Sequence, residues 1–110
     1  MQIFSALGDP TRARIVEVLS RRDLTAGEIA ARFPVSRPAV SRHLRVLRKA
    51  HLVHSRGEAQ RRVYSLDPRG LDEVDRWVAQ CREKWNARLD ALGRHLDVIA
   101  AHETTKKEKR

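Results

Sequence analysis

The sequence lacks most features that identify an extracellular, membrane-bound or catalytic protein. It has one cysteine, Cys81, so no intramolecular disulfide can form, which is typical of a reducing cytoplasm. No apolar run approaches the length of a membrane-spanning helix, and no stretch has the pattern of a signal peptide. The five histidines and scattered serines form no nucleophile elbow, P-loop or HExxH motif. We therefore expect a cytoplasmic protein that is not an enzyme and needs no cofactor.

Aromatic residues are scarce, and acidic residues are outnumbered. Aromatics make up 5% of the chain, too few for the stacking platform that single-strand binders use. The 23 Lys and Arg exceed the 14 Asp and Glu, which gives a net charge of +9. This surplus favours a polyanionic partner, and without a membrane segment we expect duplex nucleic acid rather than an anionic membrane surface. With 110 residues, the chain is long enough for one domain with a modest core.

The most informative stretch is a predicted helix from Ser36 to Ala50. Ser36 is a favourable N-cap, and Pro38 falls in the first turn, where its missing N–H does no harm. At about 100° per residue, one half of the helix is apolar and the other carries only hydroxyls and cations. The apolar half comprises Ala39, Val40, His43, Leu44, Val46, Leu47 and Ala50; the polar half comprises Arg37, Ser41, Arg42, Arg45, Arg48 and Lys49.

The polar half of this helix has two interpretations. A surface helix commonly carries solvated charge, but such a face mixes signs and gains from i,i+4 pairs. This face contains no acid, and Ser and Arg at the front of a helix can reach phosphates and base edges in a major groove. We therefore predict that DNA is contacted by Ser36, Arg37, Ser41, Arg42, Arg45, Arg48 and Lys49.

The segments before this helix predict two further helices. Asp9 and Pro10 form a strong helix start, and the apolar spacing continues to about Ser20. Thr25 to Glu28 reads as a capping box that opens a third helix, which Pro34 ends. The stretch 2–7 is apolar but too brief to be a stable helix alone. A short helix, a tight turn and a basic-faced helix make a helix-turn-helix.

A β-hairpin is predicted directly after the basic helix. The stretches 51–56 and 61–66 are rich in Val, Tyr and Ser and flank a turn over 57–60. A hairpin in this place is a wing, and Arg56, Arg61 and Arg62 near its tip can contact the DNA backbone or the minor groove. Charge that protects an edge strand is the other interpretation. The two are equal for Arg56, and DNA contact is favoured for Arg61 and Arg62.

The remainder, from Leu71 to about Glu103, has an apolar stripe at steps of three and four residues. It predicts one long helix or two helices in close series, with Gly93 as the weak point. One helix would run roughly 50 Å, longer than so small a domain can cover, so part of the stripe must pack on a partner, most simply in a symmetric dimer. Acids on the opposite face disfavour a membrane-surface helix. The stripe comprises Val74, Val78, Cys81, Trp85, Leu89, Leu92, Leu96 and Ile99.

The domain is expected to span residues 1–103, and 104–110 to be a disordered basic tail.

Three segments, "ALGDPTRARIVEVL", "LTAGEIAARFPVSRPAVSRHLRVLRKAHLV" and "RRVYSL", resemble the ArsR-type (ArsR/SmtB) winged-helix transcriptional repressors. The resemblance runs from about Phe4 to Leu66. The later stretch "WVAQCREKWNARLDALGRHL" is similar to a branch of that family with paired tryptophans.

The resemblance implies a mainly α fold with a two-stranded β-wing and a homodimer joined through its first and last helices on an inverted-repeat operator. It implies recognition by Ser36, Arg37, Ser41, Arg42 and Arg45, with wing contacts from Arg61 or Arg62. The dimer interface is then expected to comprise Phe4, Leu7, Trp85, Leu89, Leu92, Leu96 and Ile99.

The sequence departs from the family pattern at the metal sites. Many relatives sense a metal through a Cys-x-Cys pair before the recognition helix or through Asp and His ligands on the last helix. Here "RRDLTAGEIA" has no cysteine, and His95 and His102 lie about 10 Å apart along one helix, too far to share a zinc ion. Cys81 is expected to be a small buried hydrophobe. We expect no metal switch, although a site across two subunits stays open.

Two other functions remain as alternatives. The chain could be a protein interaction module that uses its long last helix, with a vestigial helix-turn-helix. Binding to double-stranded RNA is less favoured, because the major groove of an A-form helix does not admit a helix.

Overall fold

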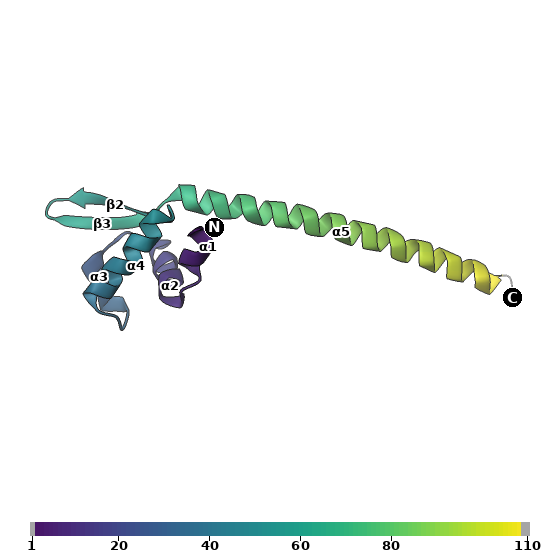
Figure 1. The fold of residues 1–110 in the computed structure, drawn as a ribbon, viewed down its shortest axis with the longest axis horizontal. Coiled ribbons are helices and arrows are strands. Elements are labelled where there is room, and N and C mark those ends of the chain that lie inside the picture. Colours follow the sequence, from purple (N-terminus) through teal and green to yellow (C-terminus); the bar gives the residue numbers. More distant parts are fainter. Residues whose placement is uncertain (1, 109–110) are drawn as a thin grey trace. The chain divides into compact units, whose positions relative to one another are not determined.

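The computed structural model describes residues 2–108, with side chains placed for 2–101. The chain divides into a first unit that ends at Val74 and a second that begins at Asp75. Figure 1 labels the elements, which follow one another as α1 (Gln2–Leu7), α2 (Pro10–Leu19), β1 (Leu24–Thr25), α3 (Ala26–Arg32), α4 (Arg37–Lys49), β2 (Val53–Glu58), β3 (Arg61–Leu66) and α5 (Pro68–Glu108).

Three helices begin where the sequence predicts, each at a side-chain cap. The Asp9 carboxylate accepts a hydrogen bond from the backbone N–H of Arg12 over 3.0 Å at the start of α2. At α3, Thr25 Oγ1 accepts from the N–H of Glu28 over 3.2 Å, and the Glu28 carboxylate accepts from the N–H of Thr25 over 3.0 Å. Ser36 Oγ accepts from the N–H of Ala39 over 3.2 Å at α4. These bonds satisfy backbone donors that have no partner within the helix.

Residues 2–7 form the helix α1, which the sequence suggested was too short to be stable alone. Its stability comes from tertiary contacts, since Ile3 and Ala6 are buried in the core. Arg12 of α2 also donates from Nε to the carbonyl of Ala6 over 2.7 Å and from Nη2 to the carbonyl of Ser5 over 3.1 Å. The guanidinium thereby caps the end of α1.

The predicted wing is present, but the sheet has a third strand. The strand order is β1-β3-β2, and both pairings are antiparallel. The two residues of β1 pair with Tyr64 and Val63 of β3. The register of β2 on β3 joins Glu58 to Arg61, so the turn contains only Ala59 and Gln60.

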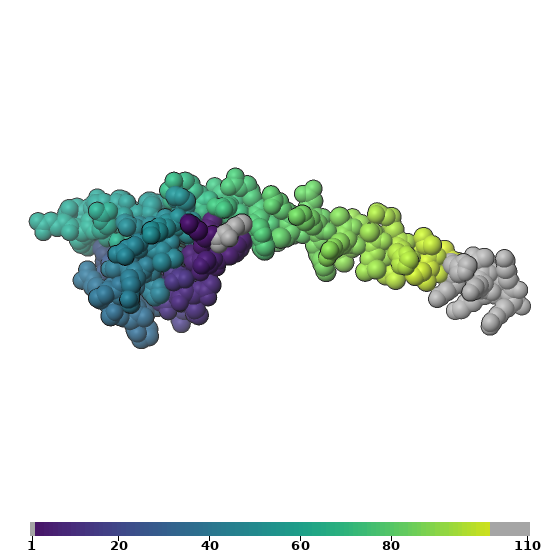
Figure 2. All heavy atoms as spheres, viewed as in Figure 1, coloured from purple at the N-terminus to yellow at the C-terminus, as the bar shows by residue number. Residues whose placement is uncertain are grey.

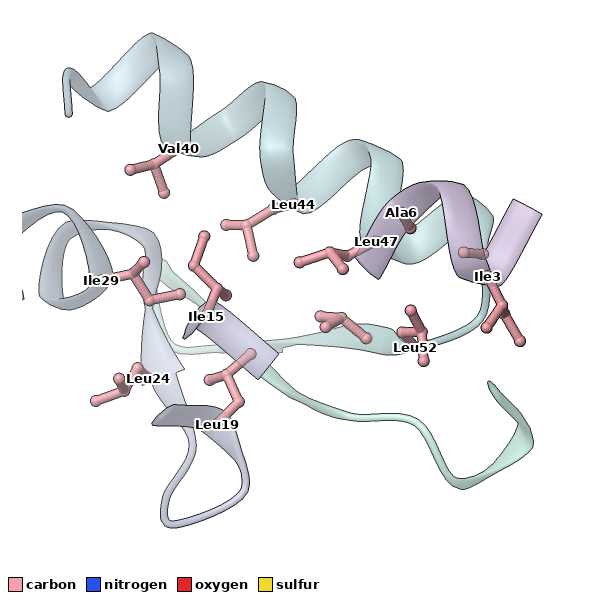
Figure 3. Packing of buried hydrophobic residues seen from close by; sticks show 12 residues of the cluster. Ile3, Ala6, Ile15, Leu19, Leu24, Ile29, Val40, Leu44, Leu47 and Leu52 are labelled. Atoms are coloured by element: carbon pink, nitrogen blue, oxygen red, sulfur yellow. The ribbon is translucent and has the colours of Figure 1, made fainter. Parts of the chain in front are cut away.

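The core of the first unit lies between the helices α1 to α4 and the sheet. Ile15 of α2, Ile29 of α3 and Leu44 of α4 point toward one another in Figure 3, and each is at most 1% exposed. Leu24 of β1 and Leu52, just before β2, belong to the same cluster on the side of the sheet. Burial of these aliphatic side chains supplies the main driving force for folding of the unit.

The start of α5 is fixed against the turn that follows α4. The N–H of Asp67 donates to the carbonyl of Leu52 over 2.9 Å, and the N–H of Gly70 donates to the carbonyl of His51 over 2.8 Å. Leu71 and Val74 then pack against the core of the first unit.

The second unit consists of the rest of α5, which is continuous through Gly93. Within this unit no other element packs on the helix, and no residue from 75 to 101 is buried. Figure 2 shows the side chains of this part of α5 on one face. Residues 104–108 are helical, where the sequence predicted a disordered tail from 104 to 110. Residues 109–110 lie outside the described part. A domain boundary at 103 stays a prediction. No helix among the described residues has the length and apolar character needed to cross a membrane.

Candidate nucleic-acid interface

The face of α4 that the sequence assigned to DNA is exposed along its whole length. Arg37, Ser41, Arg42, Arg45, Arg48 and Lys49 are all exposed, as is the capping residue Ser36. On the opposite side Val40, Leu44 and Leu47 are buried in the core. The predicted division of the helix is therefore confirmed except at Val46, which is 38% exposed because it lies at the edge of the buried face. Contact of the polar face with DNA stays a prediction.

The front of α4 is positioned by its cap and by α3. The Ser36 hydroxyl uses one lone pair for the cap and keeps its hydrogen for another acceptor. The guanidinium of Arg37 lies against α3, because a Cβ built on Gly27 would be 3.6 Å from its Cζ atom. The first arginine of the polar face therefore extends toward α3.

His43, predicted on the apolar half, connects α4 to the start of α2. Its Nδ1 lies 3.9 Å from Oδ2 of Asp9, and its side chain is 20% exposed. The backbone N–H of Arg12, and to a smaller extent the nearby positive charges, hold the pKa of Asp9 below its usual value. On the side opposite its basic face, α4 therefore lies close to the N-cap of α2, through His43 and Asp9.

The three arginines of the wing do not form the predicted cluster at its tip. Side chains alternate between the faces of a strand, so the register places Arg62 on the face of Ser55, whereas Arg61 lies with Arg56 and Glu58 on the other face. Figure 1 shows the hairpin beside α4, and the two elements are in contact. The face of Arg62 and Ser55 is the one that turns toward α4, because Arg48 of α4 reaches Ser55.

Arg56 is held by an acidic partner within the chain. Its Nη1 donates to Oδ2 of Asp23 over 2.9 Å and to Oγ of Ser65 over 2.9 Å, and its Nη2 lies 3.6 Å from Glu58. The hydrogen bond from Arg56 lowers the pKa of Asp23, and the same bond raises the pKa of Arg56. This pairing neutralises the guanidinium and favours the edge-strand interpretation of Arg56 over DNA contact.

Ser55 is a residue of this surface that the sequence analysis missed. Its Oγ accepts from Nη1 of Arg62 over 3.1 Å and from Nη1 of Arg48 over 3.4 Å. The two arginines stand 14 positions apart but meet at one hydroxyl. The sequence predicted a turn over residues 57–60. A prediction of a two-residue turn at 59–60 would have placed Ser55 and Arg62 as diagonal neighbours on one face of the hairpin.

The residues expected at a dimer interface divide into two groups. Phe4 and Leu7 of α1 are partly buried and pack against the core. The residues on α5 are exposed in the single chain: Trp85 by 59%, Leu89 by 46%, Leu92 by 53%, Leu96 by 55% and Ile99 by 41%.

Cys81 lies on the same stripe and is also exposed, so its predicted burial is not seen in the single chain. Within the described residues, no group of three or more His, Cys, Asp or Glu is arranged to hold a metal ion. His95 is exposed on α5, and the side chain of His102 lies outside the described part.

Comparisons with known proteins agree on one family. Residues 9–55 match the family described as "Bacterial regulatory protein, arsR family". The chain is 45% identical to the HTH-type transcriptional regulator Rv2034 of Mycobacterium tuberculosis, over 82% of this chain and 88% of that protein. It is 37% identical to the transcriptional repressor SdpR of Bacillus subtilis, over 69% of this chain and 84% of that one.

A solved structure shares the fold as well. The ArsR-like transcriptional regulator from Rhodococcus sp. RHA1 superposes with a TM-score of 0.73 at 34% identity, covering 83% of this chain and 86% of that one.

Proposed function

The chain belongs to the ArsR family of bacterial transcriptional regulators and is a DNA-binding regulator rather than an enzyme. From this premise we propose that it is a cytoplasmic repressor that acts as a homodimer on an inverted-repeat operator. In this proposal α4 enters the major groove and the hairpin β2–β3 follows the adjacent backbone.

The observation that carries the proposal is the exposed, acid-free face of α4. Arg42 and Arg45 stand in the middle of this face, where a helix lying in the major groove brings side chains to base edges. Arg48 and Lys49 stand in the last turn, where phosphate contact is the natural role. On the hairpin, Arg62 belongs to this surface, and Arg61 contributes charge from the other face.

A homodimer is supported by the apolar stripe of α5. Trp85, Leu92 and Leu96 are each more than half exposed in the single chain, and contiguous apolar surface of this kind marks an interaction site. Two subunits paired through this stripe and through α1 would present two α4 helices to two half-sites.

We further propose that repression needs no metal. A metal switch requires ligands that bind the ion differently in the two states of the repressor, and the cysteine pair of metal-sensing relatives is missing here. Operator affinity should therefore stay unchanged when zinc, cadmium, nickel or copper is added and then chelated. A tenfold change lost in a His95→Ala/His102→Ala double variant would contradict this.

The test of the proposed function is selection of duplex fragments from a random pool by the purified protein, followed by titration of variants. Arg42→Ala and Arg45→Ala should each cost about 1–3 kcal/mol on the selected duplex and much less on a random one. Lys49→Ala should weaken binding to both duplexes alike and lower the salt dependence. Equal losses on both duplexes for Arg42→Ala and Arg45→Ala would refute base recognition by α4. Failure to select any sequence would favour the interaction-module alternative.

A further inference from the structure

Arg48 and Arg62 approach the same atom from two different elements. Nη1 of Arg62, on β3, donates to Oγ of Ser55 over 3.1 Å, and Nη1 of Arg48, in the last turn of α4, donates to it over 3.4 Å. A hydroxyl oxygen has two lone pairs, so it can accept from both groups at once. Ser55 thus brings one guanidinium of the basic helix and one of the wing together.

These two guanidiniums lack the acidic partner that their neighbour has. In the part of the chain with described side chains, neither Arg48 nor Arg62 is in an ion pair, whereas Arg56 on the other face is balanced by Asp23 and Glu58. Each guanidinium has five N–H donors and uses one of them on Ser55. Two exposed cations with unused donors side by side repel each other, and an oxyanion between them would remove the repulsion and accept those donors.

We propose that Arg48 and Arg62 form a single clamp for one backbone phosphate of the bound duplex, and that Ser55 positions the two guanidiniums for it. The inference rests on the proposed function and deepens it by assigning one phosphate to the junction of α4 and β3. The preformed geometry reduces the rotamer entropy that two long side chains would otherwise lose on binding. Helix and wing then bind DNA as one unit, because the phosphate needs both arginines.

A double-mutant cycle on duplex affinity tests this clamp. Arg48→Ala and Arg62→Ala should each weaken binding about tenfold, and the double variant should bind little more weakly than the weaker single variant. Independent contacts would instead multiply to about a hundredfold. The slope of log affinity against log salt should fall by about 0.9 per bound subunit in the double variant, the value for one phosphate on B-form DNA, rather than by about 1.8.

The matched control is Arg61→Ala, one residue along the chain but on the opposite face of the hairpin. Combined with Arg48→Ala, it should give losses that multiply, because the two side chains share no ligand. Arg48→Gln and Arg62→Gln form a second set of variants that keeps most of the side-chain packing, and circular dichroism of every variant checks the fold.

Ser55 is tested as a positioning residue by its dependence on the two arginines. Ser55→Ala should weaken duplex binding in the wild-type background, and Ser55→Thr, which keeps the hydroxyl on a strand-favouring residue, should restore it. In the Arg48→Ala/Arg62→Ala background, Ser55→Ala should have no further effect. A purely structural role for Ser55 would give the same loss in both backgrounds.

The outcomes separate this proposal from the function on which it rests. Multiplicative losses for Arg48 and Arg62, with selective duplex binding intact, would overturn the clamp alone. Absence of salt-dependent duplex binding by the wild-type protein would overturn the proposed function and the clamp together.

Discussion

Asp67, a residue that is only 3% exposed, connects β3 to α5 through its carboxylate. Its Oδ1 accepts from the backbone N–H of Arg69 over 3.0 Å, and its Oδ2 accepts from Nη2 of the same residue over 2.8 Å. This guanidinium, with the backbone bond, lowers the pKa of Asp67 from 3.8 to about 2 in spite of burial. The ionised carboxylate is therefore part of the folded structure.

Asp67→Asn tests this through pH. Because the folded state lowers the pKa, the carboxylate stabilises the fold fully above about pH 4 and loses this contribution as the pH falls through about 2. The variant should lose about 1–3 kcal/mol of unfolding free energy at neutral pH, and the difference from wild type should shrink between pH 4 and 2. Urea unfolding at several pH values measures it. A difference that stays constant with pH would show that the charge is not the cause.

Gly70 permits the close approach of α5 to the turn after α4. A Cβ built at this position would lie 2.8 Å from the carbonyl carbon of His51 and closer still to its oxygen, which accepts the Gly70 N–H. Gly70→Ala should therefore destabilise the first unit by about 1–3 kcal/mol. Gly93→Ala is the control, since nothing lies within 4 Å of a Cβ there and alanine favours the helix by about 1 kcal/mol. Thermal unfolding that ranks the two variants in the opposite order would contradict the packing argument.

At the scale of the elements, local signals predicted the helices α2, α3 and α4 and the presence of the hairpin, although β2 runs from Val53 to Glu58, two residues later than predicted. The caps at Asp9, Thr25 and Ser36 act within three residues of themselves, so the sequence contains the whole interaction. The helical spacing of apolar residues likewise predicted the buried half of α4, apart from Val46 at its edge. The DNA contacts of the residues on the polar face of α4 remain a prediction.

The elements that escaped prediction depend on contacts between distant residues. Strand β1 has only two residues and exists because it pairs with β3, about 40 positions later. Helix α1 depends on Arg12 and on core burial, and the Arg56–Asp23 ion pair joins residues 33 positions apart. No period or motif signals such pairs, so the third strand and the pairing of Arg56 with Asp23 became visible only in the fold.

The turn of the hairpin contains an alanine in the left-handed backbone region, which is unfavourable for residues with a Cβ. Ala59 has a φ of 56°, and it is the first of the two turn residues. Glycine takes this region without the steric cost of a Cβ, so Ala59→Gly should stabilise the protein by about 0.5–1 kcal/mol after its larger unfolded-state entropy is deducted. Gln60→Gly, with no positive φ to relieve, should be neutral or destabilising. Chemical denaturation that gives both variants the same change would disprove the strain at Ala59.

For the molecule as a whole, the two units carry different parts of the proposed function. The first has its own core and presents the basic face of α4, whereas the second offers only one side of a helix. A single subunit would bind one half-site, and its affinity would come largely from the phosphates that its cations neutralise. Pairing two subunits makes the second half-site an intramolecular contact, which raises affinity without any new side chain on the DNA.

Leu92→Glu tests this pairing, because it places a carboxylate in the middle of the exposed stripe of α5. The variant should sediment as a monomer at micromolar concentration and bind the selected operator about a hundredfold more weakly, while its affinity for a single half-site stays unchanged. Ala87→Glu adds the same charge about 200° around the helix from Trp85 and should leave the dimer intact. A wild-type protein that sediments as a monomer, or an Ala87→Glu variant that dissociates equally, would contradict dimerisation through this stripe. Retained half-site binding by Leu92→Glu would also show that the first unit folds and recognises DNA without the partner subunit.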